Sequence, residues 1–331
     1  MKKKGKLVIS LDFELLWGMR DKRTIDSYGK NILGGRDAIS KMLDIFTEFN
    51  VVATFATVGF LFAKDNEELL AFSPEFKPKY DDKNLSAYNG HFDLIGNNEN
   101  EDKYHFAGSL IEEIKKYPKQ EIASHTFCHY YCLENGQDII DFKEDLTAAI
   151  AIAEKRGIKL ESLVFPRNQY NEEYLEVCKE LGITSYRGNE EVWFNKAESG
   201  QDETMFKRLF RLLDSYINIS GYHTYSLFDI KKSIPYNIPS SRFLRAYSPK
   251  LKFFEKLKLN RILKSMTYAA KNNEIYHLWW HPHNFGDFQR ENFQFLKKTL
   301  NHYQTLNSKY GFTSATMKDI VSEIKLEHNG R

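Results

Sequence analysis

The chain has 331 residues, enough for one large α/β domain or two ordinary ones with a sizeable buried core. Its net charge of +2 gives no electrostatic reason to expect a nucleic-acid partner, because such proteins usually carry a strongly basic surface. The three cysteines do not resemble a disulfide framework and fit a reducing compartment. Composition therefore argues against a nucleic-acid-binding module and a disulfide-rich secreted domain.

The N-terminus resembles a secretion signal only in its first residues. Residues 1–4 include three lysines, but the apolar run at 7–11 is interrupted by Ser10 and ended by Asp12, so it is too short for a signal-peptide core. No uninterrupted apolar segment approaches the ~20 residues that span a bilayer. We therefore expect no transmembrane segment and a cytoplasmic protein, which a secreted polymer would not reach as a substrate.

Short apolar segments alternate with helical patterns along most of the chain. The first, residues 6–14, predicts a buried strand on which Asp12 and Glu14 project to the same side, because alternate residues of a strand share a face. Further strands are predicted just before His125 and at 51–58, 163–165, 183–187, 275–280 and 312–315. Helices are predicted at 37–49, 109–116, 138–155, 172–181, 250–271 and 291–308.

The alternation of strands and helices indicates a parallel sheet, either open or closed into a barrel. Two stretches interrupt it. Residues 73–108 are rich in Pro, Gly, Asn and Asp, and residues 190–248 show little clear periodicity. Because the sequence contains no internal repeat and no convincing linker, we interpret residues 1–331 as a single domain that carries these two insertions.

Two histidines four residues apart, His125 and His129, follow directly on one predicted strand. On a helix these positions share one face about one turn apart, so both imidazoles can reach a single metal ion. Ser124 and Thr126 are candidate caps for that turn. Two histidines on the surface of an ordinary helix have the same spacing, so the motif alone does not decide between these interpretations.

Polar or ionisable residues stand at the C-terminal ends of four predicted strands. They are Asp12 with Glu14, His125 with His129, Arg167 with Asn168, and His281 with His283. In (β/α) barrels the active site is assembled at this end of the sheet, an arrangement that random surface polarity would not favour. The coincidence predicts that these four segments form one active site.

The order of these motifs resembles that of the polysaccharide deacetylase family (NodB-homology domain, carbohydrate esterase family 4). An acidic motif on the first strand, an H-[ST]-x-x-H-like motif, an Arg/Pro motif and a late histidine occur in that order between Leu7 and Phe285. The resemblance implies a distorted (β/α) barrel of about seven parallel strands. It also implies a hydrolase that binds a divalent metal and removes N-acetyl or O-acetyl groups from sugars.

The resemblance assigns metal binding to Glu14, His125 and His129. Two histidines and one carboxylate suit Zn²⁺ best, although Co²⁺, Ni²⁺ and Mn²⁺ accept the same donors. Three protein ligands leave one position for water, whose pKa a zinc ion lowers from ~15.7 toward ~7. The implied cofactor is therefore one divalent metal ion, with zinc as the first choice.

The other motifs supply the implied proton-transfer groups. Asp12 matches the catalytic base and His281 the general acid that protonates the leaving amine, with His283 as a second candidate for this acid. Arg167 stands in the Arg/Pro motif and is expected to orient Asp12, although the proline precedes the arginine here. The acid of the family's fourth motif has three candidates in this sequence, Glu190, Glu191 and Asp214.

The implied substrate is an N-acetylated sugar, nucleotide- or lipid-linked, that is a precursor in cell-surface polysaccharide biosynthesis. The aromatic rings of residues 278–286 suit stacking on a sugar face, but core burial would also account for them. Backbone N–H groups around Asn168 are expected to stabilise the developing oxyanion. The sequence leaves the oligomeric state open. The candidate substrate-binding residues are Trp17, Asn168, Tyr170, Trp280 and His283.

Three other functions compete with this interpretation. Cys128 and Cys132 interleave with the two histidines and suggest a structural zinc site, but four ligands within eight residues are sterically awkward. An allantoinase-like hydrolase of a non-sugar amide would use the same fold and metal. A catalytically inactive sugar-binding protein is the third, against which the presence of base, ligands and acid together argues.

The predicted helix at 250–271 carries a row of basic residues against a single glutamate. Such a row is usually the solvated face of a peripheral helix, which we take as the simplest interpretation. Contact with an anionic membrane or with a diphosphate-bearing substrate are the alternatives. The residues are Lys250, Lys252, Lys256, Lys258, Arg261 and Lys264, with Glu255 as the acid.

Overall fold

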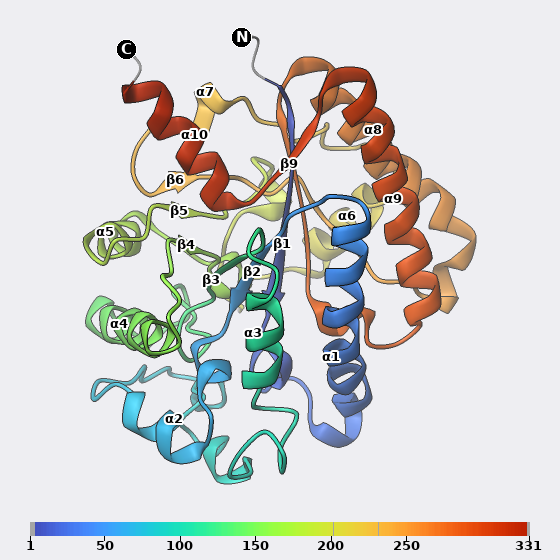
Figure 1. The fold of residues 1–331 in the computed structure, drawn as a ribbon. Coiled ribbons are helices and arrows are strands. Elements are labelled where there is room, and N and C mark those ends of the chain that lie inside the picture. Colours follow the sequence, from blue (N-terminus) through green and yellow to red (C-terminus); the bar gives the residue numbers. More distant parts are fainter. Residues whose placement is uncertain (1–3, 201, 231, 330–331) are drawn as a thin grey trace.

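A computed structural model of the chain describes residues 4–200, 202–230 and 232–329, so the basic residues 1–3 lie outside the described part. Parallel strands form a curled sheet at the centre and helices surround it (Figure 1). The strands are β1 (Lys6–Phe13), β2 (Thr54–Thr57), β3 (Glu121–Ser124), β4 (Ser162–Leu163), β5 (Ser185–Tyr186), β6 (Tyr236–Asn237), β7 (Arg242–Phe243), β8 (Ile275–Trp280) and β9 (Thr313–Ala315). The helices are α1 (Ile25–Glu48), α2 (Asn66–Phe72), α3 (Gly108–Lys115), α4 (Ile139–Lys155), α5 (Glu172–Glu180), α6 (Met205–Asp214), α7 (Leu227–Ile230), α8 (Glu255–Asn272), α9 (Gln289–Tyr310) and α10 (Met317–Asn329).

Strand β1 is the centre of the sheet and lies between β2 and β8. All but its first residue are buried, as expected for a parallel strand that helices cover on the outside. The strand order is β6-β5-β4-β3-β2-β1-β8-β7, and β9 pairs with the beginning of β1. Every pairing between two of these strands is parallel, so the C-terminal ends of the strands lie together, at the lower end of the sheet in Figure 1.

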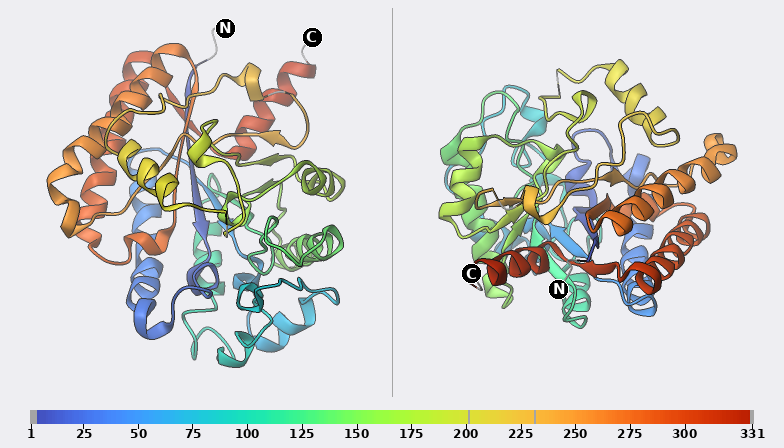
Figure 2. Two further views of the ribbon diagram at one scale, coloured as in Figure 1. Left: turned by 180° about the vertical axis from the view of Figure 1, so that it is seen from behind. Right: turned by 90° about the horizontal axis from the view of Figure 1, so that it is seen from above.

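The predicted distorted (β/α) barrel is confirmed, and the part of the chain that the structure describes has nine strands rather than about seven. The difference comes from very short strands, because β4, β5, β6 and β7 have two residues each. Helices α1, α8 and α9 lie on one side of the sheet, and α4 and α5 lie on another (Figures 1 and 2). Helix α10 lies at the end where the strands begin, and its Lys318 N–H donates to Glu121 Oε2 at the start of β3 (3.0 Å).

The chain itself joins the two edges of the sheet. Strand β6 pairs with β5, β7 pairs with β8, and only residues 238–241 separate β6 from β7. Within this connection the Ser240 N–H donates to the Gly188 carbonyl (2.9 Å), and the Ser241 N–H donates to the His277 carbonyl (2.8 Å). This tether closes the barrel between the β5 side and the β8 side.

Helix α1 begins at Ile25, whereas the sequence predicted a start at 37. Thr24 forms a capping box with Ser27, in which each side chain accepts a hydrogen bond from the backbone N–H of the other residue. The predicted start was wrong because glycines in the first half of the helix have low helix propensity and hid the pattern. Among these, Gly35 has a specific packing role at the site.

The segments predicted as insertions differ in structure. Residues 73–108 contain only two short 3-10 turns before α3, whereas residues 190–248 supply α6, α7 and the strands β6 and β7. The second segment therefore contributes to the barrel as well as to its rim. Across the described ranges, no helix is long and apolar enough to cross a lipid bilayer.

Candidate active site

Strand β1 carries the predicted catalytic base next to its C-terminal end. The carboxylate of Asp12 accepts two hydrogen bonds from Arg187, at 2.6 Å from Nη1 and 2.8 Å from Nη2. The buried guanidinium also donates to Ser10 Oγ (3.0 Å) and Asn168 Oδ1 (2.9 Å). Burial acts to raise the pKa of Asp12, but the charge and hydrogen bonds of Arg187 outweigh it and lower this pKa. The carboxylate is therefore ionised and fixed in orientation.

The arginine against Asp12 is Arg187 and not Arg167, the residue that the sequence assigned to this role. Arg167 follows β4 with a left-handed backbone (φ 53°), and its guanidinium pairs with Glu134 (2.8 Å) and Asp21. These two carboxylates hold it at the rim of the site. Arg187 directly follows β5, so the rule that polar residues at strand ends build the site would have identified it.

The three predicted metal ligands lie together. Glu14 directly follows β1, and its Oε2 lies 3.3 Å from His125 Nε2 and 3.0 Å from His129 Nε2. All three side chains are buried. Burial acts to raise the pKa of Glu14, but the charge of His281 and the adjacent imidazoles of His125 and His129 keep this pKa well below its usual value. Two imidazoles and an ionised carboxylate thus converge on one point.

This set of donors fits a divalent metal ion. The Nδ1 of His125 lies 2.7 Å from the Val164 carbonyl, to which it can only donate, so Nε2 carries the lone pair that a metal needs. Burial lowers the pKa of His129 to about 4, which keeps this imidazole neutral. Nη1 of Arg20 lies 3.4 Å from His129 Nδ1 and can only donate, so this long contact must open for His129 to bind a metal through Nε2.

The two histidines lie on a loop and not on the helix that their spacing suggested. Thr126 and His129 have left-handed backbone angles (φ 62° and 59°), which no helix accommodates. The carboxylate of Asp145, on α4, accepts hydrogen bonds from the N–H groups of Phe127 (2.7 Å) and Cys128 (3.0 Å). A partner distant in sequence therefore folds the loop, and the i, i+4 spacing predicted its shape wrongly.

The late histidines differ in their access to solvent. His281 borders the cavity, and its Nε2 lies 3.6 Å from Asp12 Oδ2 and 3.8 Å from Glu14 Oε1. His283 is buried, and its Nε2 lies 3.7 Å from Glu14 Oε1. Glu14, His281 and His283 form a second group of potential metal ligands, but its carboxylate–imidazole distances are longer than those to His125 and His129. The first group is the better metal site.

The group that faces Nδ1 of His281 is an amide, Asn284 Oδ1, at 3.3 Å. Of the three acids proposed for the fourth motif, Asp214 pairs with Arg242 (2.6 Å) and Glu190 accepts from Asn195 (3.0 Å). No carboxylate of the described residues takes the expected position beside this nitrogen.

Helix α1 packs directly against the segment that bears these histidines. A Cβ atom on Gly35 would lie 2.7 Å from the Cα of His283, and one on Gly34 would lie 2.1 Å from the Gly286 carbonyl oxygen. Real Cβ atoms do not approach backbone so closely, so only glycine allows the helix and the 3-10 turn Pro282–Phe285 to meet here. The glycine pair therefore sets the position of the late histidines.

A cavity of about 690 Å³ opens beside these groups. Asp12, Glu14, His125, His129 and His281 line one side of it, and residues of the 190–215 segment line another. Among the predicted substrate-binding residues, Asn168 lines this cavity, whereas Trp17, Tyr170, Trp280 and His283 do not. The tryptophan on the cavity wall is Trp279, whose ring lies 4.1 Å from the Arg187 guanidinium carbon.

The residues outside the cavity have partners in the core. Trp17 Nε1 donates to the His105 carbonyl (2.9 Å), and Trp280 is stacked on Phe285 with ring centroids 5.8 Å apart. The N–H of Asn168, a predicted oxyanion donor, instead donates to the Phe165 carbonyl (2.9 Å). An oxyanion at this site thus cannot rely on that N–H.

The cysteines do not support a structural zinc site. Cys128 and Cys132 are buried, and burial raises the pKa of both thiols well above the usual value. A zinc ligand must be a thiolate, which such an environment disfavours. Neither of the two potential metal-binding groups in the described ranges contains a cysteine.

Comparison with solved structures identifies the class of fold. A protein from Mycobacterium smegmatis assigned as a polysaccharide deacetylase matches with a TM-score of 0.60 at 14% identity, over 99% of this chain and 93% of its own. One from Pseudomonas aeruginosa PAO1 with the same assignment matches with a TM-score of 0.54 at 10% identity, over 98% and 91%. A GH57-type branching enzyme from Pyrococcus horikoshii matches with a TM-score of 0.53 at 12% identity, over 96% and 70%.

These matches confirm the predicted resemblance at the level of the fold, which is that of the polysaccharide deacetylases. The identities are too low to carry an activity across, and the branching enzyme has the same fold with a different printed function. No family model matches the chain. The reaction must therefore be argued from the site itself.

Proposed function

We propose that this protein is a metal-dependent hydrolase that removes the acetyl group from an N-acetylated sugar. The observation that carries the proposal is the convergence of Glu14, His125 and His129 on one point, with Asp12 and His281 beside it at the C-terminal end of the sheet. Ligands, base and acid are thus within reach of one bound acyl group. The deacetylases that share the fold support this reaction class.

A bound divalent metal, with zinc as the first choice, supplies Lewis acidity toward the acyl carbonyl and a water of lowered pKa. Glu14, His125 and His129 would hold this ion. Asp12 accepts the proton of the attacking water, and it can do so because Arg187 keeps the carboxylate ionised in a buried position. Arg187 is a positioning residue in this scheme, the role that the sequence gave to Arg167.

His281 is the general acid. The leaving group of amide hydrolysis is an amine, which is too basic to depart as an anion and needs a proton on nitrogen. His281 lines the cavity and can reach a substrate, whereas His283 is buried, and burial lowers its pKa to about 4. His283 therefore packs behind Glu14 while His281 transfers the proton.

The substrate is a sugar attached to a carrier, as a precursor of cell-surface polysaccharide. Trp279 on the cavity wall offers an aromatic face for a sugar ring, the role first given to Trp280. Cationic side chains also line the cavity, among them Arg208, Arg211 and Arg245, and they suit the phosphate groups of a nucleotide or lipid carrier. Arg208 and Arg211 also pair with Glu203, and Arg245 donates to Ser215 Oγ, so a phosphate would be bound beside these partners.

Metal analysis coupled to acetate release tests the proposal. His125→Ala should lose both bound metal and turnover, because it removes one of three ligands. Asp12→Asn should keep the metal and lose turnover by about 10³-fold, since the base contributes roughly 10²–10⁴-fold. Tyr170→Phe, at a position off the cavity, is the matched control and should keep both. Full turnover of Asp12→Asn, or metal bound equally by His125→Ala, would refute the proposal.

Removal of the metal gives a second test. Dialysis against a chelator should reduce acetate release to the level of His125→Ala, and added Zn²⁺ or Co²⁺ should restore it. The chelator should reduce acetate release by the Cys128→Ser/Cys132→Ser variant by the same factor as acetate release by the wild type. Activity that persists without metal would point to a hydrolase of another class.

A further inference from the structure

Helix α6 is amphipathic, and its orientation is the reverse of that of an ordinary surface helix. Its polar side faces the protein, where Asp214 is buried and pairs with Arg242 (2.6 Å) and Arg261 (3.4 Å). Lys207 and Arg211 on the same side line the active-site cavity. A helix that packs on a core normally turns its apolar side inward. Here the apolar side is left to face outward.

The outward side is formed by large apolar residues at helical spacing. Met205 is 77% exposed, Phe206 59%, Leu209 48% and Leu213 40%. Residues 205, 209 and 213 are four apart and therefore lie in one row along the helix. Scattered exposed leucines are common on proteins, but a continuous row of this kind marks a surface that binds another apolar phase.

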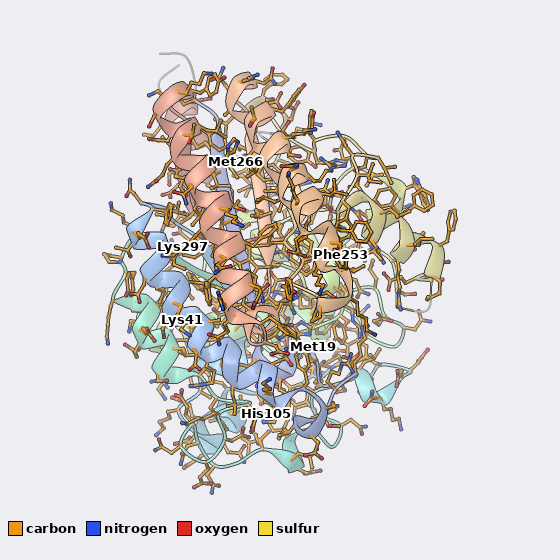
Figure 3. All side chains as sticks on the ribbon, turned by 90° about the vertical axis from the view of Figure 1, so that its right-hand side faces the viewer. Met19, Lys41, His105, Phe253, Met266 and Lys297 are labelled. Atoms are coloured by element: carbon orange, nitrogen blue, oxygen red, sulfur yellow. The ribbon has the colours of Figure 1, made fainter. Side chains whose placement is uncertain are left out.

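The row continues beyond the helix at both ends. On one side, Trp193 is half exposed and its ring is stacked on Phe206 at 6.0 Å. On the other, Tyr216 contacts Phe254 with ring centroids 5.9 Å apart, next to the 83% exposed Phe253 in the 3-10 turn Pro249–Phe254 before α8. Figure 3 shows Phe253 on the side of the molecule where α8 meets α6. We call the set Trp193, Met205, Phe206, Leu209, Leu213 and Phe253 the apolar ridge.

Lysines flank the apolar ridge. Lys250, Lys252 and Lys256 are exposed, and Lys252 lies over the Phe253 ring at 5.2 Å. No carboxylate of the described residues pairs with these three lysines. Two other residues of the basic row at 250–264 differ from these lysines. Lys258 and Arg261 are buried, and they pair with Glu255 and Asp214 respectively. The solvated-face interpretation therefore holds for only part of that row.

We propose that the apolar ridge docks on the surface of an anionic lipid bilayer. Exposed Trp, Phe, Leu and Met side chains beside lysines are the composition of helices that lie in the bilayer interface, and the lysines complement the lipid phosphates. A second copy of this chain is the less suitable occupant, because a symmetric contact would set the same lysines against one another. The docking is peripheral, in keeping with the lack of a membrane-crossing helix in the described ranges.

Docking in this orientation places the active-site cavity at the bilayer. The same short helix turns its apolar side outward and lines the cavity with Lys207, Arg208 and Arg211 on the other side. A sugar on a lipid phosphate would thus have its acyl chain in the bilayer, its phosphate beside these cations and its acetamido group at the catalytic residues. This assignment of the lipid-linked carrier rests on the proposed function, whereas the docking surface itself does not.

Vesicle flotation tests the docking surface. The full-length protein should float with vesicles of phosphatidylcholine and phosphatidylglycerol in equal parts, and more weakly with phosphatidylcholine alone. Phe206→Glu/Leu209→Glu should reduce the bound fraction at least about tenfold, because both charges enter the apolar contact. Leu326→Glu is the matched control: it replaces a more exposed leucine (73%) on α10 and should bind like the wild type. Lys250→Ser/Lys252→Ser/Lys256→Ser should lose the preference for anionic vesicles.

Two outcomes would overturn this proposal. One is that the wild type does not float, or that the Phe206→Glu/Leu209→Glu variant floats as well as it does. The other is a concentration-dependent dimer in sedimentation that this variant abolishes, which would make the ridge a contact between copies. A variant that unfolds at the same temperature as the wild type is taken as folded. If Phe206→Glu/Leu209→Glu does not fold, the single variant Leu209→Ser is used instead, with the same expected loss of vesicle binding.

Acetate release from a soluble N-acetylated sugar separates this proposal from the proposed function. The ridge variant should release acetate from that soluble sugar at the wild-type rate and lose activity only on a lipid-linked sugar in vesicles. Vesicle binding without acetate release from any sugar would refute the enzyme and leave the docking surface intact. Equal rates of wild type and ridge variant on the vesicle-borne sugar would refute the lipid-linked assignment.

Discussion

Two buried carboxylates, Asp12 and Glu121, lie at opposite ends of the same sheet and differ in their partners. Asp12 stands near the C-terminal end of β1 and faces the guanidinium of Arg187. Glu121 begins β3 and accepts hydrogen bonds from neutral groups, Thr54 Oγ1 (2.7 Å), Ser162 Oγ (2.6 Å) and the Lys318 N–H. Burial raises the pKa of Glu121, whereas the arginine lowers that of Asp12, although both side chains are buried.

The difference teaches that partners, and not burial, decide which end of the barrel can do chemistry. A hollow of about 760 Å³ also lies at the Glu121 end, comparable in size to the active-site cavity. Its described lining contains lysines and one buried glutamate but no histidine. The hydroxyls of Thr54 and Ser162 and the Lys318 N–H make Glu121 a link between β2, β3, β4 and α10. The described residues that line this hollow, Asp319 included, form no group of potential metal ligands like those at the other end.

Of the changes considered, removal of Arg187 should have the largest effect on the difference between Asp12 and Glu121. Arg187→Gln leaves the Asp12 carboxylate buried without its cation, so its pKa should rise and the base should be protonated near neutral pH. We expect a loss of about 10²–10³-fold in acetate release and of about 3–5 kcal/mol in the free energy of unfolding. Steady-state kinetics and urea unfolding measure the two effects.

Arg167→Gln is the matched control for that variant, because this arginine pairs with Glu134 and Asp21 at the rim and does not touch Asp12. It should change acetate release by less than about tenfold. If Arg167→Gln is as damaging as Arg187→Gln, then Arg187 is not the residue that holds the base.

Replacement of Glu121 should test the same difference through the pH dependence of the free energy of unfolding. The folded-state pKa of Glu121 is raised above the unfolded value, so the wild type loses stability as pH rises through the interval between them. Glu121→Gln has no such proton to lose. Its free energy of unfolding should be about 1 kcal/mol below that of the wild type at pH 4. This deficit should decrease toward pH 8, and acetate release should stay within about twofold of the wild-type rate. Urea unfolding at several pH values measures this, and a variant that weakens further with pH contradicts it.

Ser10→Ala should give the smallest effect. Ser10 Oγ accepts from Arg187 Nη1 (3.0 Å) and lies 2.8 Å from Nε2 of His277, whose pKa burial lowers to about 3. Arg187 keeps both bonds to Asp12 without the hydroxyl. We expect a loss of about 1 kcal/mol in unfolding free energy and less than about fivefold in turnover, and a larger loss would mean that Ser10 helps to place Arg187.

The sequence predicted what local pattern controls. Strands β1 and β8 were predicted within one residue at each end, because both are buried and bounded by charge or proline. The pattern also placed Glu14, His125 and His129 at strand ends that the fold brings together. The shape of the histidine loop could not be predicted, because Asp145 determines it from 17 residues beyond Cys128.

The sequence analysis missed two residues of the site, Arg187 and Trp279, for different reasons. Arg187 stood at the end of a predicted strand, so a signal existed and an inverted Arg/Pro motif drew attention to Arg167 instead. The choice between Trp279 and Trp280 had no local signal, because adjacent residues of a strand face opposite sides and only the assembled barrel shows which side is the cavity. Side-chain direction relative to a distant wall is a tertiary property.

The tether at 238–241 gives the site a dependence on connectivity. Arg187 follows β5 and His281 follows β8, the strands next to the edge strands β6 and β7. The four-residue span between β6 and β7 holds these two edges at a high effective concentration relative to each other. Cleavage of the chain in this span would retain every catalytic side chain. The two edges of the sheet could then meet only through a much longer loop closure. Circular permutants opened here should therefore assemble the base and the acid more slowly than permutants opened in surface loops elsewhere.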